Sequence, residues 1–224
     1  MEDAALARGD ARVKFRCIRQ TETQLTKIKG EEWQPLAKAL MVSEHYGAAP
    51  VCADGRIAGN GAMVAASGSI VVSKSGRIAG TRYDATQFVR VHAFDRASWK
   101  VVFDAADDHE VQPSSDTPLL WHALRVAPLS LGWTKHPRFV LHGHICASSE
   151  EAQALHVPCS TTETLFSTPE DLQALADLLA EYPYPQHQIF VRLNHGFFLL
   201  ADSADEAIHL LHTKLLVGRR ANKL

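Results

Sequence analysis

The sequence has no apolar run that approaches the roughly 20 residues needed to cross a bilayer, so it predicts no membrane-spanning helix. Residues 1–6 carry acidic side chains where a secretory signal would carry basic ones, and no apolar core follows them. We therefore expect a cytoplasmic protein with no membrane partner.

A long run of lysine or arginine is also missing, and the formal net charge is −2. Without concentrated positive charge there is no reason to expect nucleic acid binding. The short basic stretch at residues 218–220 is interpreted as a solvated end. The cysteines show no C-x-x-C spacing, and in a reducing compartment they are expected to be buried or half-buried thiols. They are Cys17, Cys52, Cys146 and Cys159.

The composition is that of an ordinary globular protein, with 46% hydrophobic and 21% charged residues over 224 positions. This length is enough for one large domain with a sizeable core. No repeat, low-complexity segment or long linker divides the chain. We predict a single domain over residues 1–224, in which residues 1–10 are loose and polar.

Apolar periodicity predicts strands early in the chain and interleaved helices later, which indicates an α/β or α+β sheet with helices on its faces. Helix starts are marked by capping boxes at Ser148 with Glu151 and at Ser203 with Glu206. Strands are predicted over residues 11–18, 62–66, 69–73, 86–94, 98–103, 138–141, 187–193 and 197–201. Helices are predicted over residues 31–45 and 168–182, and from about residues 115, 148 and 203 onwards.

The sharpest chemical feature is His142-Gly143-His144, which follows a short apolar strand. Residues i and i+2 of an extended chain point to the same side, so two imidazoles can converge on one ion. Gly143 is expected to let the chain bend and to keep the approach open. The alternative is two unrelated polar residues at a strand exit, because H-x-H also occurs by chance.

A metal needs a third ligand, and His195 is the candidate because it lies between two apolar strands. The alternative there is a core histidine that is hydrogen-bonded to backbone. Asp116 offers a carboxylate near a predicted helix start. On spacing alone, a helix cap or first-turn acid is the better interpretation of Asp116.

These features resemble the class II aldolase/adducin family. Its members include fuculose- and rhamnulose-phosphate aldolases, ribulose-phosphate 4-epimerase, methylthioribulose-phosphate dehydratase and the non-catalytic adducin head. Five motifs match in family order between about residues 38 and 216. They are Gly59-Asn60, the strand and turn over residues 70–76, Ser114-Ser115-Asp116 with the following His122, His142-Gly143-His144, and His195-Gly196 with the strand and helix after it.

The resemblance implies a three-layer α/β/α domain with a central, mostly antiparallel sheet, assembled as a homo-oligomer, a tetramer in relatives. It also implies zinc or another divalent transition metal held by His142, His144 and His195. A substrate phosphate would be held through hydroxyls, an amide and backbone N–H groups, without a lysine. The residues implied for that phosphate are Asn60, Ser75, Gly76, Ser114 and Ser115.

The implied function is a lyase or epimerase acting on a small phosphorylated ketose, or a related hydroxy-carbonyl compound, through a zinc-stabilised enediolate. Asp116 would be its proton-transferring group, in a Ser-Ser-Asp-Thr-Pro segment similar to that of the epimerases. Two alternatives stay open: a catalytically silent, adducin-like interaction or regulatory module, and a purely structural zinc site. The intact set of three histidines argues against the silent module, which has no need to keep all three ligands. Three ligands with an open fourth position argue against the structural site, because structural zinc sites are usually closed by four protein ligands.

The chain departs from the family between His144 and His195, where it is shorter. The missing stretch is a loop that carries acid and base residues in relatives. Glu163 is the only acid near this position, and its alternative interpretation is a solvated loop residue.

Overall fold

The computed structural model describes residues 13–20, 30–105 and 111–216. The predictions for residues 1–10 and 218–220 lie outside these ranges. The described strands form one eight-stranded sheet in the order β1-β5-β4-β3-β2-β6-β8-β7. Only β1 and β5 pair in parallel, so the predicted mostly antiparallel α/β sheet is confirmed. The strands are β1 (Arg16–Arg19), β2 (Gly59–Val64), β3 (Ile70–Ser73), β4 (Phe88–Asp95), β5 (Lys100–Ala105), β6 (Phe139–Gly143), β7 (Ile189–Arg192) and β8 (Gly196–Ala201).

Both predicted pairs of early strands are present. β2 and β3 form an antiparallel hairpin whose turn closes with a hydrogen bond from the Gly68 N–H to the Ala65 carbonyl. Gly68 has a φ of 82°, which glycine adopts without the steric cost that a side chain adds. β4 and β5 form the second antiparallel pair. The short apolar runs on either side of Gly68, and the second pair of predicted strands, therefore placed these elements correctly to within a few residues.

The described helices are α2 (Gly30–His45), α3 (Thr117–Trp121), α4 (Ala127–Ser130), α5 (Ser149–Ala154), α6 (Pro169–Glu181) and α7 (Ala204–Leu210), with π-helical turns η2 (His122–Val126) and η3 (Leu211–Leu216). Three of them, α5, α6 and α7, begin directly after the capping residues that the sequence marks. The short 3₁₀ turn η1 is Ala85–Gln87. None of the helices in these ranges is long and apolar enough to cross a membrane.

One of the two predicted capping boxes is complete. The Ser148 hydroxyl accepts from the Glu151 N–H, and the Glu151 carboxylate accepts from the Ser148 N–H. At α7, the Ser203 hydroxyl accepts from the Glu206 N–H as predicted. The Glu206 carboxylate, however, accepts from the N–H of Asp202 instead of Ser203. The second prediction was therefore half wrong, because the acid reaches one residue further back.

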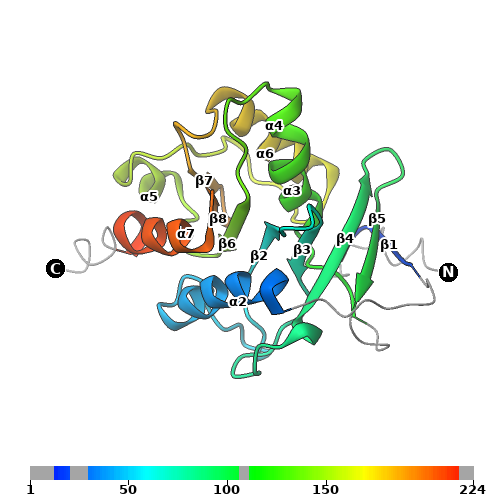
Figure 1. Ribbon diagram of the computed structural model, residues 1–224. Helices are drawn as coiled ribbons and strands as arrows, with labels where there is room; N and C mark the ends of the chain where they lie inside the picture. Colours follow the sequence, from blue (N-terminus) through cyan, green and yellow to red (C-terminus); the bar gives the residue numbers. More distant parts are fainter. Residues whose placement is uncertain (1–12, 21–29, 106–110, 217–224) are drawn as a thin grey trace.

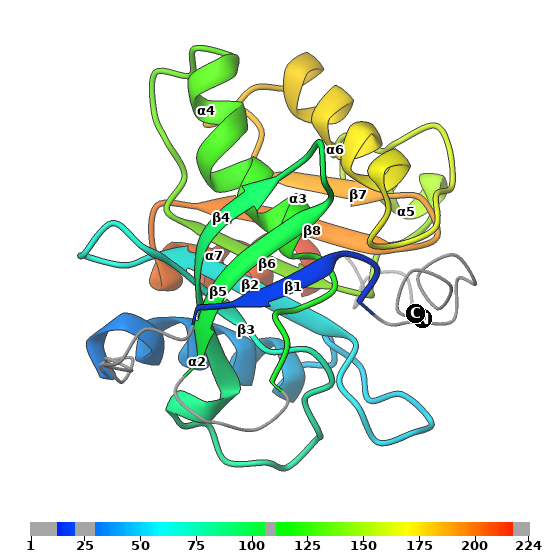
Figure 2. The same ribbon diagram turned by 90° about the vertical axis from the view of Figure 1, so that its right-hand side faces the viewer.

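Helices cover both faces of the sheet, giving the predicted three layers. Figure 1 shows α2 and α7 on one side and α3, α4 and α6 on the other. Figure 2 shows that β4 and β5, which lie towards one end of the sheet, run in a different direction from β7 and β8 at the other end, as the right-handed twist of sheets requires. Each face buries its own apolar cluster.

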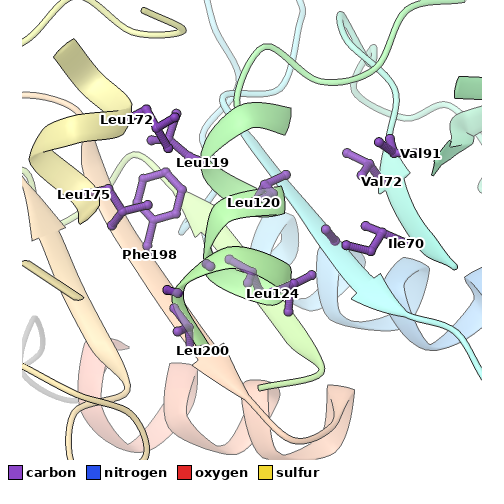
Figure 3. Packing of buried hydrophobic residues seen from close by; sticks show 14 of the residues in the cluster. Ile70, Val72, Val91, Leu119, Leu120, Leu124, Leu172, Leu175, Phe198 and Leu200 are labelled. Carbon is purple, nitrogen blue, oxygen red and sulfur yellow. The ribbon is translucent and has the colours of Figure 1, made fainter. Parts of the chain in front are cut away.

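The apolar cluster under α3 and α6 holds in place two helices whose first turns lie near the candidate site. Figure 3 shows Leu172 and Leu175 of α6 beside Phe198 of β8. Leu119 and Leu120 come from α3 and also belong to this cluster, and all five side chains are essentially inaccessible to solvent. Burying a leucine or phenylalanine side chain contributes about 1.5–3 kcal/mol, so the start of α6 is held firmly against the sheet.

Candidate metal centre and substrate pocket

The site lies where four neighbouring strands of the sheet, β3, β2, β6 and β8, begin or end. β2 is antiparallel to both β3 and β6, and β6 is antiparallel to β8. The carboxyl ends of β3 and β6 and the amino ends of β2 and β8 are therefore side by side. The sequence places its polar motifs at these four ends, so segments distant in the chain meet at one place.

Three histidines converge at these strand ends. His142 is in β6, His144 follows the strand, and His195 is in the turn before β8. One ring nitrogen from each lies within 4.8 Å of the other two. The ring centroids of His142 and His144 are 5.0 Å apart, as expected for residues i and i+2 on one side of a strand. His142 and His195 are buried, whereas His144 is exposed.

The hydrogen bonding of His142 indicates which nitrogen is free. Its Nδ1 lies 2.7 Å from the Phe197 carbonyl oxygen, which can only accept, so Nδ1 carries the proton. Nε2 then presents a lone pair, and this buried atom has no hydrogen-bond partner. Burial, together with the nearby His195, lowers the pKa of His142 to about 3, so the ring is neutral at pH 7. A buried neutral imidazole with an unpartnered lone pair fits a metal ligand.

Asp116 occupies the space between the two buried imidazoles. Its Oδ2 accepts a hydrogen bond of 2.5 Å from the Asn60 side-chain amide and lies 3.5 Å from His142 Nε2. Its Oδ1 lies 3.9 Å from His195 Nε2 and has no hydrogen-bond partner. Asp116 stands at the N-cap position of α3, yet its side chain makes no capping bond. The interpretation of Asp116 as a cap is thus right about its position and wrong about its contacts.

His195 is oriented from both sides of its ring. Nε2 faces Asp116, and Nδ1 lies 3.8 Å from Oδ1 of Asp171. Burial alone would lower the pKa of His195, but the two carboxylates outweigh burial and the pKa lies above its ordinary value. The backbone around this ring is unusual, since Asn194 has a φ of 56° and Gly196 a φ of 135°.

Gly143 and Gly196 allow the strands that carry the histidines to approach closely. A Cβ on Gly196 would lie 2.1 Å from the Gly143 carbonyl oxygen, and a Cβ on Gly143 would lie 2.3 Å from the Ala48 carbonyl oxygen. Gly143 lies inside β6, and the chain bends only from His144 onwards. Gly143 thus provides room for neighbouring backbone, which differs from the predicted bend.

A pocket of about 170 Å³ opens beside the histidines. It is several times the volume of about 30 Å³ that one water occupies in the liquid, so it admits a small molecule. All five residues that the resemblance implied for a phosphate line it: Asn60, Ser75, Gly76, Ser114 and Ser115. His144, His195 and Asp116 line the same pocket.

Some of the hydrogen-bond donors that were expected to hold a phosphate are already used within the protein. The Ser75 N–H bonds to the Gln112 carbonyl and the Ser114 N–H to the Ser73 carbonyl, so these two backbone donors are occupied. The Asn60 amide nitrogen donates to Asp116. Serine hydroxyls remain as donors in the pocket.

Two cations line the pocket, although a site without lysine was expected. Arg77 is buried and its guanidinium contacts Glu44 at 2.8 Å, Tyr83 and the Gly59 carbonyl, so its charge is compensated within the protein. Lys74 is half-buried and lines the pocket directly before Ser75. Lys74 was not among the residues predicted for the phosphate.

The exposed position of Glu163 fits the alternative interpretation of a solvated loop residue. Glu163 accepts a hydrogen bond of 2.8 Å from the Asn194 side chain. Its contact therefore stabilises the turn before His195, and its carboxylate is not part of the pocket lining.

Two buried charges behind His195 were not predicted from the sequence. Asp171 and Arg192 form an ion pair of 2.9 Å, and neither side chain has exposed surface. The helical spacing indicates that Asp171 faces inward, because it shares the inner face of its predicted helix with Leu175 and Leu178, four and seven positions later. Arg192 likewise ends a fully buried strand. Two opposite charges that both face inward predict a buried pair.

No family model matches the sequence, and no curated protein matches it. Solved structures with the same arrangement exist. A sugar-phosphate aldolase from Thermotoga maritima has a TM-score of 0.58 at 11% identity, over 85% of this chain and 95% of that one. An aldolase II superfamily protein from Pseudomonas syringae has a TM-score of 0.55 at 16% identity, over 87% and 77%. L-fuculose 1-phosphate aldolase from Glaciozyma antarctica has a TM-score of 0.53 at 12% identity, over 91% and 76%.

At identities this low, the comparisons show the fold and assign no substrate by themselves. The shared arrangement nevertheless extends over most of both chains in each comparison. It agrees with the resemblance that the five ordered motifs indicated, and with the observed three-layer architecture. The chain has the fold of the class II aldolases.

Proposed function

We propose that this chain is a divalent-metal-dependent lyase or epimerase that acts on a small phosphorylated ketose or a related hydroxy-carbonyl compound. The observation that carries the proposal is the convergence of three imidazoles beside a small polar pocket. The buried Nε2 of His142 has no hydrogen-bond partner, and a bound metal ion would supply one.

His142, His144 and His195 would hold the ion. Three protein ligands leave one coordination position open, which is typical of catalytic sites. Zinc suits imidazole ligands, and manganese, cobalt or iron are the alternatives, since three imidazoles select weakly among them. When bound, the ion would supply Lewis-acid stabilisation of the negative charge that develops on a substrate oxygen.

Asp116 is the proton carrier in this proposal. The hydrogen bond from Asn60 fixes one carboxylate oxygen, and the other oxygen is free of hydrogen-bond partners. That free Oδ1 lies on the side of His195, next to the pocket. A carboxylate held in this way can accept a substrate proton and return it without moving.

The serine-rich side of the pocket would bind the phosphate. Ser75, Ser114 and Ser115 offer hydroxyl donors, and Gly76 leaves the approach to the backbone open. Lys74 adds a positive charge, which strengthens hydrogen bonding to an anion. The names of two structures with the same fold, a sugar-phosphate aldolase and a fuculose 1-phosphate aldolase, support a phosphorylated sugar as the substrate class.

The experiment is a turnover assay with a panel of phosphorylated ketoses, beginning with L-fuculose 1-phosphate. Protein stripped with a chelator is compared with protein reloaded with zinc, manganese or cobalt. Release of an aldehyde and a ketose phosphate, or appearance of an epimer, is expected only in the reloaded protein. Absence of both reactions over the panel, in protein that has taken up metal, would favour a silent module and contradict the proposal.

A further inference from the structure

A buried ion pair lies directly behind the candidate metal centre. Arg192, the last residue of β7, contacts Oδ1 of Asp171 through Nε at 3.3 Å and through a terminal nitrogen at 2.9 Å. Both side chains are fully buried. Removing two charges from water is expensive, and their attraction often only offsets this penalty. The position of the pair therefore needs a reason beyond stability.

Asp171 is held on every side. Besides Arg192, its Oδ1 accepts from the Thr164 hydroxyl at 3.0 Å, and its Oδ2 accepts from the Ser167 N–H at 3.2 Å. Its own N–H donates to the Thr168 hydroxyl, which caps α6. The carboxylate cannot rotate without breaking several of these bonds, so its direction is fixed.

The ring of His195 stands in front of this fixed carboxylate. Its Nδ1 is buried and has no hydrogen-bond partner, and Asp171 Oδ1 lies 3.8 Å away. A movement of about 1 Å would bring the two atoms to ordinary hydrogen-bond distance. The opposite nitrogen, Nε2, faces Asp116 on the other side of the ring, and one ring nitrogen of His195 lies within 4.8 Å of a ring nitrogen of His142 and of His144. A proton on Nδ1 would therefore leave the Nε2 lone pair directed at the site.

We infer that Asp171, locked in place by Arg192, is a positioning residue that accepts a hydrogen bond from Nδ1 of His195 and keeps Nε2 of that ring free for the metal. This inference rests on the proposed function. Carboxylates that accept from the second nitrogen of a ligating histidine orient the ring and raise its basicity.

The neighbouring ligand shows the same arrangement with a different partner. His142 also directs Nδ1 away from the site, and there the backbone carbonyl of Phe197 accepts the proton. Each buried imidazole thus has an acceptor behind it and its Nε2 in front. Only the acceptor behind His195 carries a negative charge, so only that side can be altered by changing a side chain.

A purely structural role is the competing explanation, because the pair also joins α6 to β7. Asp171→Asn keeps the size of the side chain and removes its charge. Glu32→Gln is the matched control, since Glu32 is another buried carboxylate, paired with Arg90 at 2.9 Å on the remote helix α2. Asp171→Asn loses a fully buried ion pair and Glu32→Gln a largely buried one, and of the two carboxylates only Asp171 lies against a histidine of the site.

Two measurements separate these explanations. The first is zinc affinity of the chelator-stripped proteins, measured by competition with a chromogenic chelator, with circular dichroism verifying the fold. Asp171→Asn should weaken zinc binding about 10–100-fold, and Glu32→Gln should leave it within about twofold. The second is the tautomer of His195 in the metal-free wild type, read from long-range ¹H–¹⁵N correlations at a pH where the ring is neutral. The Nδ1–H form is expected.

The inference is overturned by the Nε2–H form in the wild type, or by equal zinc affinity in the two folded variants. The tautomer decides the matter even where Asp171→Asn fails to fold, because it needs no variant. A wild type that binds no metal but carries the Nδ1–H form would contradict the proposed function and leave the positioning of His195 intact.

Discussion

Asn60 and His142 face each other across the antiparallel pairing of β2 and β6. The Asn60 amide donates to Asp116, and the same carboxylate oxygen lies 3.5 Å from His142 Nε2. One cross-strand pair therefore sets both the imidazole and the carboxylate beside it. Asn60 and His142 lie in paired inner strands of the sheet, so their spacing is fixed by the strand register.

Asp116→Asn is predicted to keep its metal and lose turnover. Removing a general base typically costs about 10²–10⁴ in rate, while three histidines still hold the ion. The measurement is kcat for the ketose phosphate identified in the panel, together with metal content. His142→Ala serves as the inactive control. Full activity of Asp116→Asn beside an inactive His142→Ala would leave Asp116 with no catalytic role.

Lys74→Ala is predicted to raise KM for a phosphorylated substrate about tenfold, the equivalent of about 1.4 kcal/mol, with metal content unchanged. The reason is the loss of the positive charge beside the serine hydroxyls of the pocket. Lys38→Ala is the control, because Lys38 is exposed and pairs with Asp205 at 2.7 Å away from the pocket. Equal KM values for the two variants would remove Lys74 from the phosphate site.

Gly196→Ala is predicted to lower the free energy of unfolding by more than about 2 kcal/mol, because an added Cβ meets a fixed carbonyl at a φ that disfavours side chains. That Cβ would lie 2.1 Å from the Gly143 oxygen. Gly132→Ala is the control, since Gly132 has a φ of 63° with nothing within 4 Å, and should cost only about 1–2 kcal/mol. Urea denaturation measures both, and equal losses would contradict the close approach.

The stability of the metal-free protein is predicted to depend on pH through His122. Burial, with a smaller contribution from Arg96, lowers the pKa of this side chain from 6.5 to about 4. Protonation is therefore easier in the unfolded chain, so stability is full above pH 6.5 and falls as the pH drops towards 4. Between pH 7 and 5 the loss from this group is about 2 kcal/mol.

The variant His122→Gln isolates this contribution, because glutamine does not titrate. Denaturant unfolding at pH 7 and pH 5 should show a smaller loss of stability in His122→Gln than in the wild type. The same loss in both proteins would show that His122 is not the group responsible.

Much of the fold followed from local patterns. The helix α6 was predicted from its capping threonine, its proline and its spaced leucines, and the β2–β3 hairpin from two apolar runs around Gly68. These signals are local because caps and turns involve residues within a few positions of one another. The parallel pairing of β1 with β5 joins segments about 84 positions apart and leaves no local mark in the sequence.

In the candidate site, too, the local features could be predicted from the sequence and the long-range contacts could not. The convergence of His142 and His144 follows from strand geometry, and the role of His195 was suggested by a resemblance that supplied the long-range arrangement. The contacts of Asp116 with Asn60 and of Asp171 with His195 depend on how α3 and α6 sit on the sheet. Periodicity predicts which face of a helix is buried, but it does not predict what that face meets.

The most direct test of the central claim is the zinc content of chelator-stripped protein after stoichiometric zinc is added and the free metal is removed. We predict about one zinc ion per chain in the wild type and in His209→Ala, where an exposed histidine of α7 is removed. His195→Ala should retain almost none, because two remaining imidazoles bind zinc weakly. A wild type that retains no zinc or other divalent metal, or His195→Ala that retains as much as the wild type, would contradict the three-histidine centre.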